Sequence, residues 1–223
     1  MKKQTSKKSA GRTGRKAKRG REGNQIRKLN LLLILVAGIG LLLFTAVVLL
    51  RQRATMTASD PTSLSDAVLE YRDTVEFYAE KNDITEYTEY LLAIMQVETG
   101  GLGDDVMQSS ESLGLPPGSL DSEDSIAQGC SYFAEILGDA EKKNCDLDAV
   151  IQAYNFGIDY LDFAAERGGD SDLDMATEFA EWKSGGEKTE YSSALALEVN
   201  GGWRYKYGNM FYAELVKKIV ENL

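Results

Sequence analysis

YLLAIMQVETGG, residues 90–101, is the stretch of sequence that decides the fold. Four of its residues recur at the spacing i, i+3, i+4 and i+7, which is typical of one face of an α-helix: Leu91, Ile94, Met95 and Glu98. The pair Gly100-Gly101 is a typical helix end, so we expect a helix over Thr85–Glu98. Glu98 therefore takes a position on the apolar face, in the last turn of this helix.

A carboxyl in that position suits proton transfer. Desolvation and the negative end of its own helix dipole both raise the pKa of Glu98. A carboxyl with a raised pKa holds a proton near neutral pH and delivers it, as a general acid for glycosidic cleavage must. The alternative is that Glu98 frays into solvent at the helix end. Gly100-Gly101 leaves room for a backbone or a sugar to approach closely.

Helical periodicity continues through the C-terminal part of the chain. It predicts an amphipathic helix behind a cap at Ser63, and five more over residues 123–142, 146–156, 158–166, 172–183 and 209–222. Alternating patterns long enough for a convincing strand are missing from the sequence. We therefore expect an all-α domain over residues 62–223, preceded by a short polar linker over residues 51–61.

The N-terminal part of the chain has the opposite charge and a long apolar segment. Residues 1–28 hold twelve basic residues and one acid, a net charge of +11, whereas the chain after Arg53 holds 11 basic and 34 acidic residues, a net charge of −23. Residues 29–50 contain no charge in 22 positions, which predicts one transmembrane helix. A cleaved signal peptide is the alternative, but the run is long for one and ends in Arg51-Gln52-Arg53.

The charge asymmetry also predicts the topology. Because positive charge stays on the cytoplasmic side, residues 1–28 form a cytoplasmic tail and residues 62–223 lie outside the cell. Beside a membrane span, a basic run is better explained by topology and lipid contact than by nucleic-acid binding. We expect a single-pass cell membrane protein that contacts the membrane through residues 29–50 and binds no nucleic acid.

Composition excludes several classes of chemistry. The chain has no histidine, which excludes Ser-His-Asp triads, Cys-His pairs and nearly all catalytic zinc sites. Cys130 and Cys145 are expected to be free thiols, because Cys130 lies about 18 Å before the end of its helix. The acids at 170, 172, 174 and 181 imitate an EF-hand loop, but Met175 replaces its glycine, and an acidic helix N-terminus explains them better. We expect no metal and no cofactor.

Two motifs add to the helix that ends at Glu98. Residues 98–114 read ETGGLGDDVMQSSESLG, and residues 153–157 read AYNFG. Their order resembles the lysozyme-like fold of goose-type lysozymes and lytic transglycosylases. More closely, it resembles the muramidase domain of CwlT-type wall hydrolases of Gram-positive bacteria and the related pneumococcal membrane protein. The resemblance spans most of residues 63–223, including Tyr207-Gly208 near the end.

The resemblance implies roles for six residues. It makes Glu98 the catalytic acid and Asp105 a second carboxylate, with Gln108 and the adjacent Ser109 binding glycan, and Tyr154 and Asn155 forming a wall of the sugar cleft. The residues by themselves leave alternatives open. Asp104 competes with Asp105, the 108–109 pair also suits an ordinary polar loop, and the 154–155 pair also suits core and cap positions.

The sequence departs in three respects from the families that it resembles. Lytic transglycosylases typically have Glu-Ser where this chain has Glu98-Thr99, and a longer interval before a Gly-Leu-Met-Gln segment that here reads Asp105-Val106-Met107-Gln108. CwlT proteins also carry a Cys-His endopeptidase domain, which this sequence lacks.

The resemblance implies a peptidoglycan hydrolase that cuts between N-acetylmuramic acid and N-acetylglucosamine at the outer membrane face. Glu98 would protonate the leaving oxygen while Asp105 activates water. One alternative is a lytic transglycosylase, in which the sugar's 6-hydroxyl replaces water. The other is a non-catalytic module that binds glycan strands, with Tyr154 and Trp203 stacking on sugars, within a division or conjugation machinery.

Overall fold

The computed structural model describes residues 60–223. The predicted basic tail (1–28), the predicted membrane span (29–50) and most of the predicted linker (51–61) lie outside the described residues. Among residues 60–223, no helix combines the length and the apolar character needed to cross a membrane.

The amphipathic run after the linker forms two helices, where the sequence predicted one. Helix α2 covers Asp66–Leu69 and α3 covers Arg72–Lys81. Ser65, and not Ser63, caps α2, because its side-chain oxygen accepts a hydrogen bond of 3.2 Å from the backbone N–H three residues later. Ser65 also donates its hydroxyl to the carbonyl of Gly100 at 2.9 Å. This hydrogen bond holds the first residues of the domain against the glycine turn that follows Glu98.

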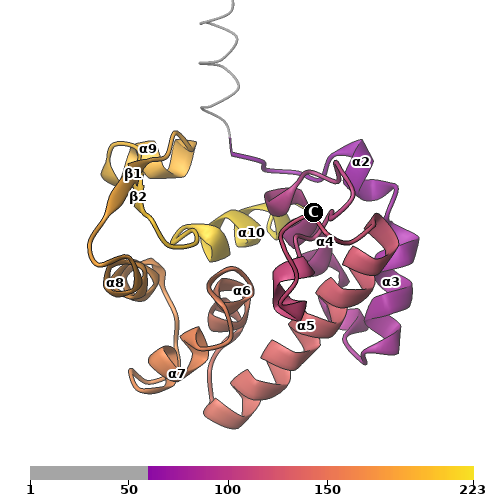
Figure 1. Cartoon of the computed structure of the whole chain (residues 1–223), viewed down its shortest axis with the longest axis horizontal. Coiled ribbons are helices and arrows are strands. Elements are labelled where there is room, and N and C mark those ends of the chain that lie inside the picture. Colours follow the sequence, from indigo (N-terminus) through magenta and orange to yellow (C-terminus); the bar gives the residue numbers. More distant parts are fainter. Residues whose placement is uncertain (1–59) are drawn as a thin grey trace, which may run out of the picture. The chain divides into compact units, whose positions relative to one another are not determined.

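Five helices that the sequence predicted carry much of the buried core. They are α4 (Thr88–Glu98), α5 (Ser122–Lys143), α6 (Leu147–Phe156), α7 (Tyr160–Ala165) and α10 (Tyr212–Val220). The expected start of α4 at Thr85 is a 3-10 turn, η1 (Thr85–Tyr87). Most of α6 is buried, and it packs against α5, α7 and α10 in Figure 1. This packing brings the C-terminal ends of α4 and α6 to one cavity.

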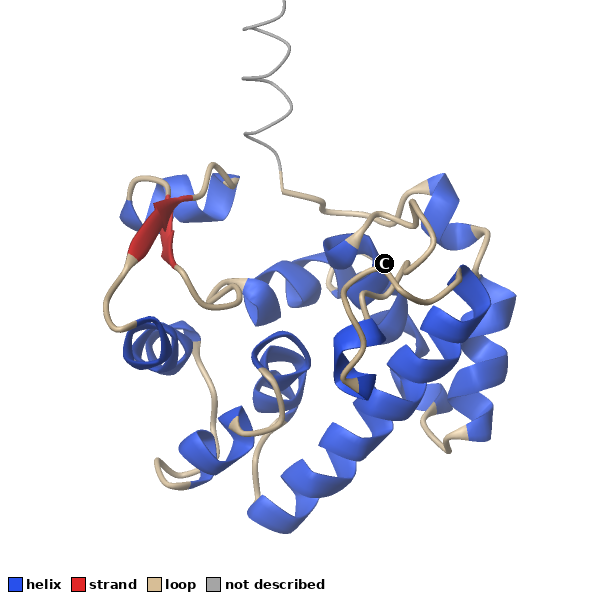
Figure 2. Ribbon diagram, viewed as in Figure 1, coloured by secondary structure: helices blue, strands red, loops and turns tan. Residues whose placement is uncertain are grey.

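The prediction of an all-α domain was too strict, because the fold is mostly helical with one small hairpin. Strands β1 (Lys188–Glu190) and β2 (Trp203–Tyr205) pair antiparallel in Figure 2. The two strands follow α8 (Leu173–Ser184), which the sequence predicted. Between them lies α9 (Ala194–Asn200), which the sequence did not predict. A strand of three residues is too short to show a period of two, so sequence patterning could not find it.

Two predictions about single residues are confirmed. Cys130, buried in α5, and Cys145, partly buried beyond its end, are free thiols. Asp172 caps α8 by accepting a hydrogen bond from the backbone N–H of Met175 at 2.8 Å. The acidic series around Asp172 thus belongs to a helix N-terminus.

Candidate active site

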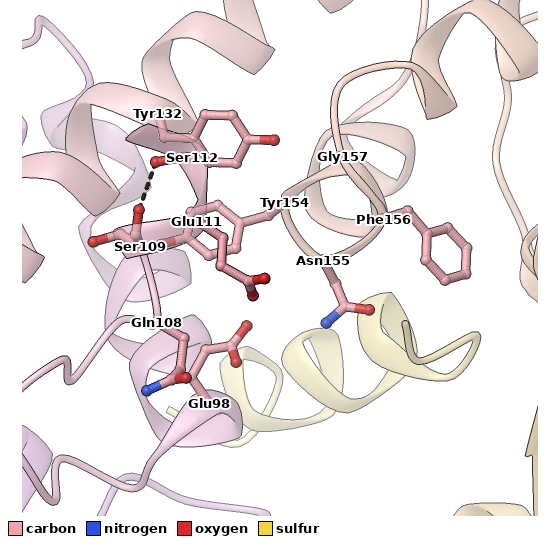
Figure 3. Close-up of a pocket in the computed structure, with 10 residues that line it drawn as sticks. All are labelled: Glu98, Gln108, Ser109, Glu111, Ser112, Tyr132, Tyr154, Asn155, Phe156 and Gly157. Atoms are coloured by element: carbon pink, nitrogen blue, oxygen red, sulfur yellow. Dashed lines mark hydrogen bonds between the residues drawn. The ribbon is translucent and has the colours of Figure 1, made fainter. Parts of the chain in front are cut away.

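A cavity of about 340 Å³ lies at the ends of α4 and α6. Figure 3 shows the ten residues that line it: Glu98, Gln108, Ser109, Glu111, Ser112, Tyr132, Tyr154, Asn155, Phe156 and Gly157. They come from the end of α4, from the 3-10 turn η2 (Ser110–Leu113) and the loop before it, from α5, and from the end of α6 with the residue after it. Five of the six residues predicted for the site are on this wall, and Asp105 is not.

Glu98 has the surroundings of a general acid. It is partly buried, and its Oε1 atom accepts a hydrogen bond from the hydroxyl of Tyr212, with 2.6 Å between the oxygens. Burial raises the pKa of Glu98 from 4.5 to about 7; the Tyr212 bond opposes this rise, and the charges of Asp105 and Glu111 add to it. A sizeable share of Glu98 is therefore protonated near neutral pH. The side chain lies on the cavity wall and is not frayed into solvent.

Tyr212 is placed by the packing of three helices. It begins α10, which contacts α4 and α6, and it is only 1% exposed. The side chain of Gln152 in α6 accepts from the N–H of Ala213 at 3.2 Å and donates to the carbonyl of Asn209 at 3.0 Å. Burial raises the pKa of Tyr212 well above 10, so its hydroxyl stays protonated as a donor to Glu98.

Asp105, the second carboxylate that the resemblance implied, does not line the cavity. It is 3% exposed, and its Oδ1 accepts from the N–H of Ser109 at 3.0 Å and from the hydroxyl of Ser125 at 2.6 Å. Its Oδ2 accepts from the N–H and the hydroxyl of Ser110, at 3.3 and 2.5 Å. Burial raises the pKa of Asp105, but the hydrogen bonds lower it by more, and the net direction is down. Both oxygens are occupied in holding the loop.

The loop that Asp105 holds carries the two residues predicted to bind glycan. Gln108 has φ of 48°, an uncommon left-handed conformation for a residue with a side chain, and its Nε2 donates to the carbonyl of Asp105 at 2.8 Å. Ser109 is 2% exposed and donates its hydroxyl to the carbonyl of Ser125 at 2.9 Å. Both residues line the cavity in a fixed arrangement.

The glycine turn after Glu98 accommodates a backbone. A Cβ atom on Gly101 would lie 2.7 Å from the backbone nitrogen of Val68 and 2.8 Å from the carbonyl carbon of Ala67. Thr99, which stands where lytic transglycosylases typically have serine, donates its hydroxyl to the carbonyl of Val106 at 2.7 Å. The turn thus joins the end of α4 to α2 and to the Asp105 loop.

Tyr154 and Asn155, at the end of α6, line the cavity together with Glu98. Tyr154 is 7% exposed, its hydroxyl donates to the carbonyl of Met107 at 3.1 Å, and its ring packs on Tyr132 with 5.5 Å between centroids. Tyr154 therefore lies at the bottom of the cavity and exposes little of its ring for stacking on a sugar. Asn155 accepts from the N–H of Asn209 at 2.6 Å through Oδ1, and Figure 3 shows its amide nitrogen on the side of Glu98.

Sequence reasoning missed five of the residues that line the cavity, which are Glu111, Ser112, Tyr132, Phe156 and Gly157. Glu111 points into the cavity toward Glu98 in Figure 3, and the acid in the polar run Gln108–Ser112 was the signal that could have found it. Trp203 lies in β2 beneath the Nζ atom of Lys188, 3.6 Å from the ring centroid, and does not line the cavity.

Known proteins resemble this chain over the same region. A family model described as Lysozyme-like matches residues 65–220. The uncharacterized membrane protein YocA of Bacillus subtilis is 35% identical over 70% of each chain. The pneumococcal vaccine antigen A homolog of Streptococcus pyogenes serotype M1 is 37% identical over 67% of this chain and 79% of the relative.

Two longer relatives match through part of their length. The bifunctional muramidase/DL-endopeptidase CwlT of Bacillus subtilis is 32% identical over 71% of this chain and 50% of its own. A crystal structure from Staphylococcus aureus, described as similar to a lipoprotein of the NLP/P60 family, has 49% identity and a TM-score of 0.70, over 70% of this chain and 53% of that one. This chain spans about half the length of each. The family model covers more than half of the chain and agrees with the fold, so the chain belongs to the lysozyme-like family.

Proposed function

We propose that this chain is a peptidoglycan hydrolase that cleaves the β-1,4 bond between N-acetylmuramic acid and N-acetylglucosamine. The observation that carries the proposal is Glu98, a carboxyl with a pKa of about 7 on the wall of a cavity in a lysozyme-like domain. The relative CwlT, whose name includes muramidase, supports the same class of reaction. The substrate would be the glycan strand, with Asn155 and Gln108 on either side of Glu98 to bind its polar groups.

In this proposal, Glu98 gives its proton to the glycosidic oxygen as the bond from that oxygen to the anomeric carbon breaks. A carboxylate remains on Glu98 after the transfer. The hydroxyl of Tyr212 stabilises this carboxylate, because the hydrogen bond favours the charged form of Glu98. Burial stabilises the protonated form of Glu98 before the transfer, and the hydrogen bond from Tyr212 stabilises its carboxylate afterwards.

One observation favours a second reaction as the alternative. Four hydrogen bonds occupy both carboxylate oxygens of Asp105, which leaves Asp105 poorly suited to activate water. A lytic transglycosylase needs no activated water, because the 6-hydroxyl of the muramic acid attacks the anomeric carbon and forms a 1,6-anhydro sugar. Mass spectrometry separates the two reactions, since a hydrolysed product exceeds an anhydro product by the mass of one water.

We also propose the cellular setting that the charge pattern predicts, with residues 29–50 in the cell membrane and residues 62–223 on the outer face. The name of YocA, a membrane protein, supports a membrane setting for this chain.

The test of the proposed function compares, on purified cell wall, two variants of the full chain in which one glutamate is replaced by neutral glutamine. Glu98→Gln keeps the shape of the side chain and removes its transferable proton, so release of glycan fragments should fall by roughly 10²- to 10⁴-fold. Glu141→Gln is the matched control, because Glu141 is exposed in α5 and lies about 13 Å along the helix from Tyr132. Its activity should equal that of the wild type. Equal activity of all three proteins would move the reaction away from Glu98.

A further inference from the structure

We infer that Glu111 is the second carboxylate of the reaction, and that Asp105 is a positioning residue that holds Glu111 in the cavity. The inference rests on the proposed function and names the residue that assists water in it. No role was expected for Glu111 from the sequence.

Glu111 shares the cavity with Glu98. Both line it, and Figure 3 shows the two carboxylates directed toward one another, with Asn155 beside them. Glu111 is exposed to solvent, and no residue among those described donates a hydrogen bond to its carboxylate. Its charge also contributes to the raised pKa of Glu98, which requires the two groups to be near each other. Glu111 therefore has free oxygens, access to water and a place beside the acid.

The charge of Asp105 also raises the pKa of Glu98, but Asp105 has no free carboxylate oxygen and does not line the cavity. Its role is to determine where Glu111 lies. Its carboxylate holds the two backbone N–H groups directly before Glu111 and also the hydroxyl of Ser110. That hydroxyl accepts from the N–H groups of Ser119 and Leu120, at 3.0 and 3.2 Å. The backbone next to Glu111 is thus fixed from both sides. This arrangement accounts for a carboxylate at position 105 without a contact to substrate.

The reaction balances with these two groups. Glu98 transfers its proton to the leaving oxygen while the bond from that oxygen to the anomeric carbon breaks. A water oxygen bonds to the anomeric carbon from the opposite face, and the carboxylate of Glu111 accepts the proton that this water loses. One water is consumed. Glu98 ends as a carboxylate and Glu111 as an acid, and a proton returns to Glu98 through solvent.

The test removes the carboxylate and supplies a replacement from solution. Glu111→Ala in the full chain should lower glycan release by roughly 100-fold or more. Sodium azide should raise the activity of this variant at least about tenfold, because a small anion takes the place of the activated water. Azide would bond to the anomeric carbon, so the product should be a glycosyl azide detectable by mass spectrometry. Asp105→Ala should also lose activity, but azide should restore none, because the buried site at position 105 does not open into the cavity.

The outcomes separate the inference from the proposed function. Full activity of Glu111→Ala, or a loss that azide does not restore, would overturn the role of Glu111 while an inactive Glu98→Gln leaves the proposed function standing. Azide rescue of Asp105→Ala in place of Glu111→Ala would return the role to Asp105. Products of the wild type that carry 1,6-anhydro ends would overturn both the inference and the proposed hydrolysis, because no water would then be used, and would leave the transglycosylase alternative. Activity retained in Glu98→Gln would overturn the proposed function itself.

Discussion

Replacing Glu98 by glutamine should stabilise the folded domain above neutral pH while it removes activity. The reason is that the folded chain buries a group that is charged at that pH. The pKa of Glu98 is about 7 in the folded chain, against an ordinary value of 4.5. At about 1.4 kcal/mol for each pH unit, this difference corresponds to on the order of 3 kcal/mol of folding free energy.

The pH window follows from the direction of that shift. Below pH 4.5 the carboxyl is protonated in the folded and the unfolded chain, and its contribution to stability is fully present. Between pH 4.5 and about 7 the unfolded chain loses its proton first, so stability falls as the pH rises. Above about pH 7 the loss is complete. Glutamine stays neutral throughout and still accepts the hydrogen bond from Tyr212, so the variant should avoid this loss.

Denaturant unfolding followed by tryptophan fluorescence measures the effect. Trp182 and Trp203 are the only two tryptophans of the chain, and both lie in the described domain, so the signal reports on it alone. Glu98→Gln should match the wild type at pH 4 and exceed it by roughly 2–3 kcal/mol at pH 8. Glu141→Gln should follow the wild type at every pH. Identical curves for Glu98→Gln and the wild type from pH 4 to pH 8 would refute the burial argument.

Three other predictions follow from the same structure. Tyr212→Phe removes the hydrogen bond that lowers the pKa of Glu98, so the alkaline limb of the pH–rate profile should move to higher pH. The rate should fall roughly 10- to 100-fold. An alkaline limb at the same pH as in the wild type would count against the hydrogen bond. Gly129→Ala would place a Cβ atom 2.9 Å from the hydroxyl of Tyr154, and should lower stability by about 1–2 kcal/mol in thermal unfolding; a variant as stable as the wild type would show that the cavity floor adjusts freely. Protease added to wall-stripped cells should digest the acidic C-terminal domain and spare the basic tail, whereas a protected domain would contradict the proposed topology.

The sequence was sufficient for the features that depend on local patterning. The period of the α4 face placed Glu98 among apolar residues at a helix end, and the structure confirms that position. Helical periodicity, the pair Gly100-Gly101 and a serine cap placed most helices, although the exact cap of α2 is Ser65 and not Ser63. The hairpin was missed because a strand of three residues has no measurable period, and α9 was missed as well.

Tertiary structure decided which groups meet Glu98 and which do not. Tyr212 lies 114 residues from Glu98 along the chain, and only the packing of α10 against α4 brings its hydroxyl to 2.6 Å. Hydrogen bonds to Ser109, Ser110 and Ser125 turned Asp105 inward to hold a loop and left Glu111 facing the cavity, although both acids belong to one short segment. Sequence spacing fixes the face of a helix because each step rotates by a constant angle. In a loop each residue's direction depends on hydrogen bonds to distant partners, such as Ser125 in α5, so the side chain that reaches the substrate is chosen only when the chain has folded.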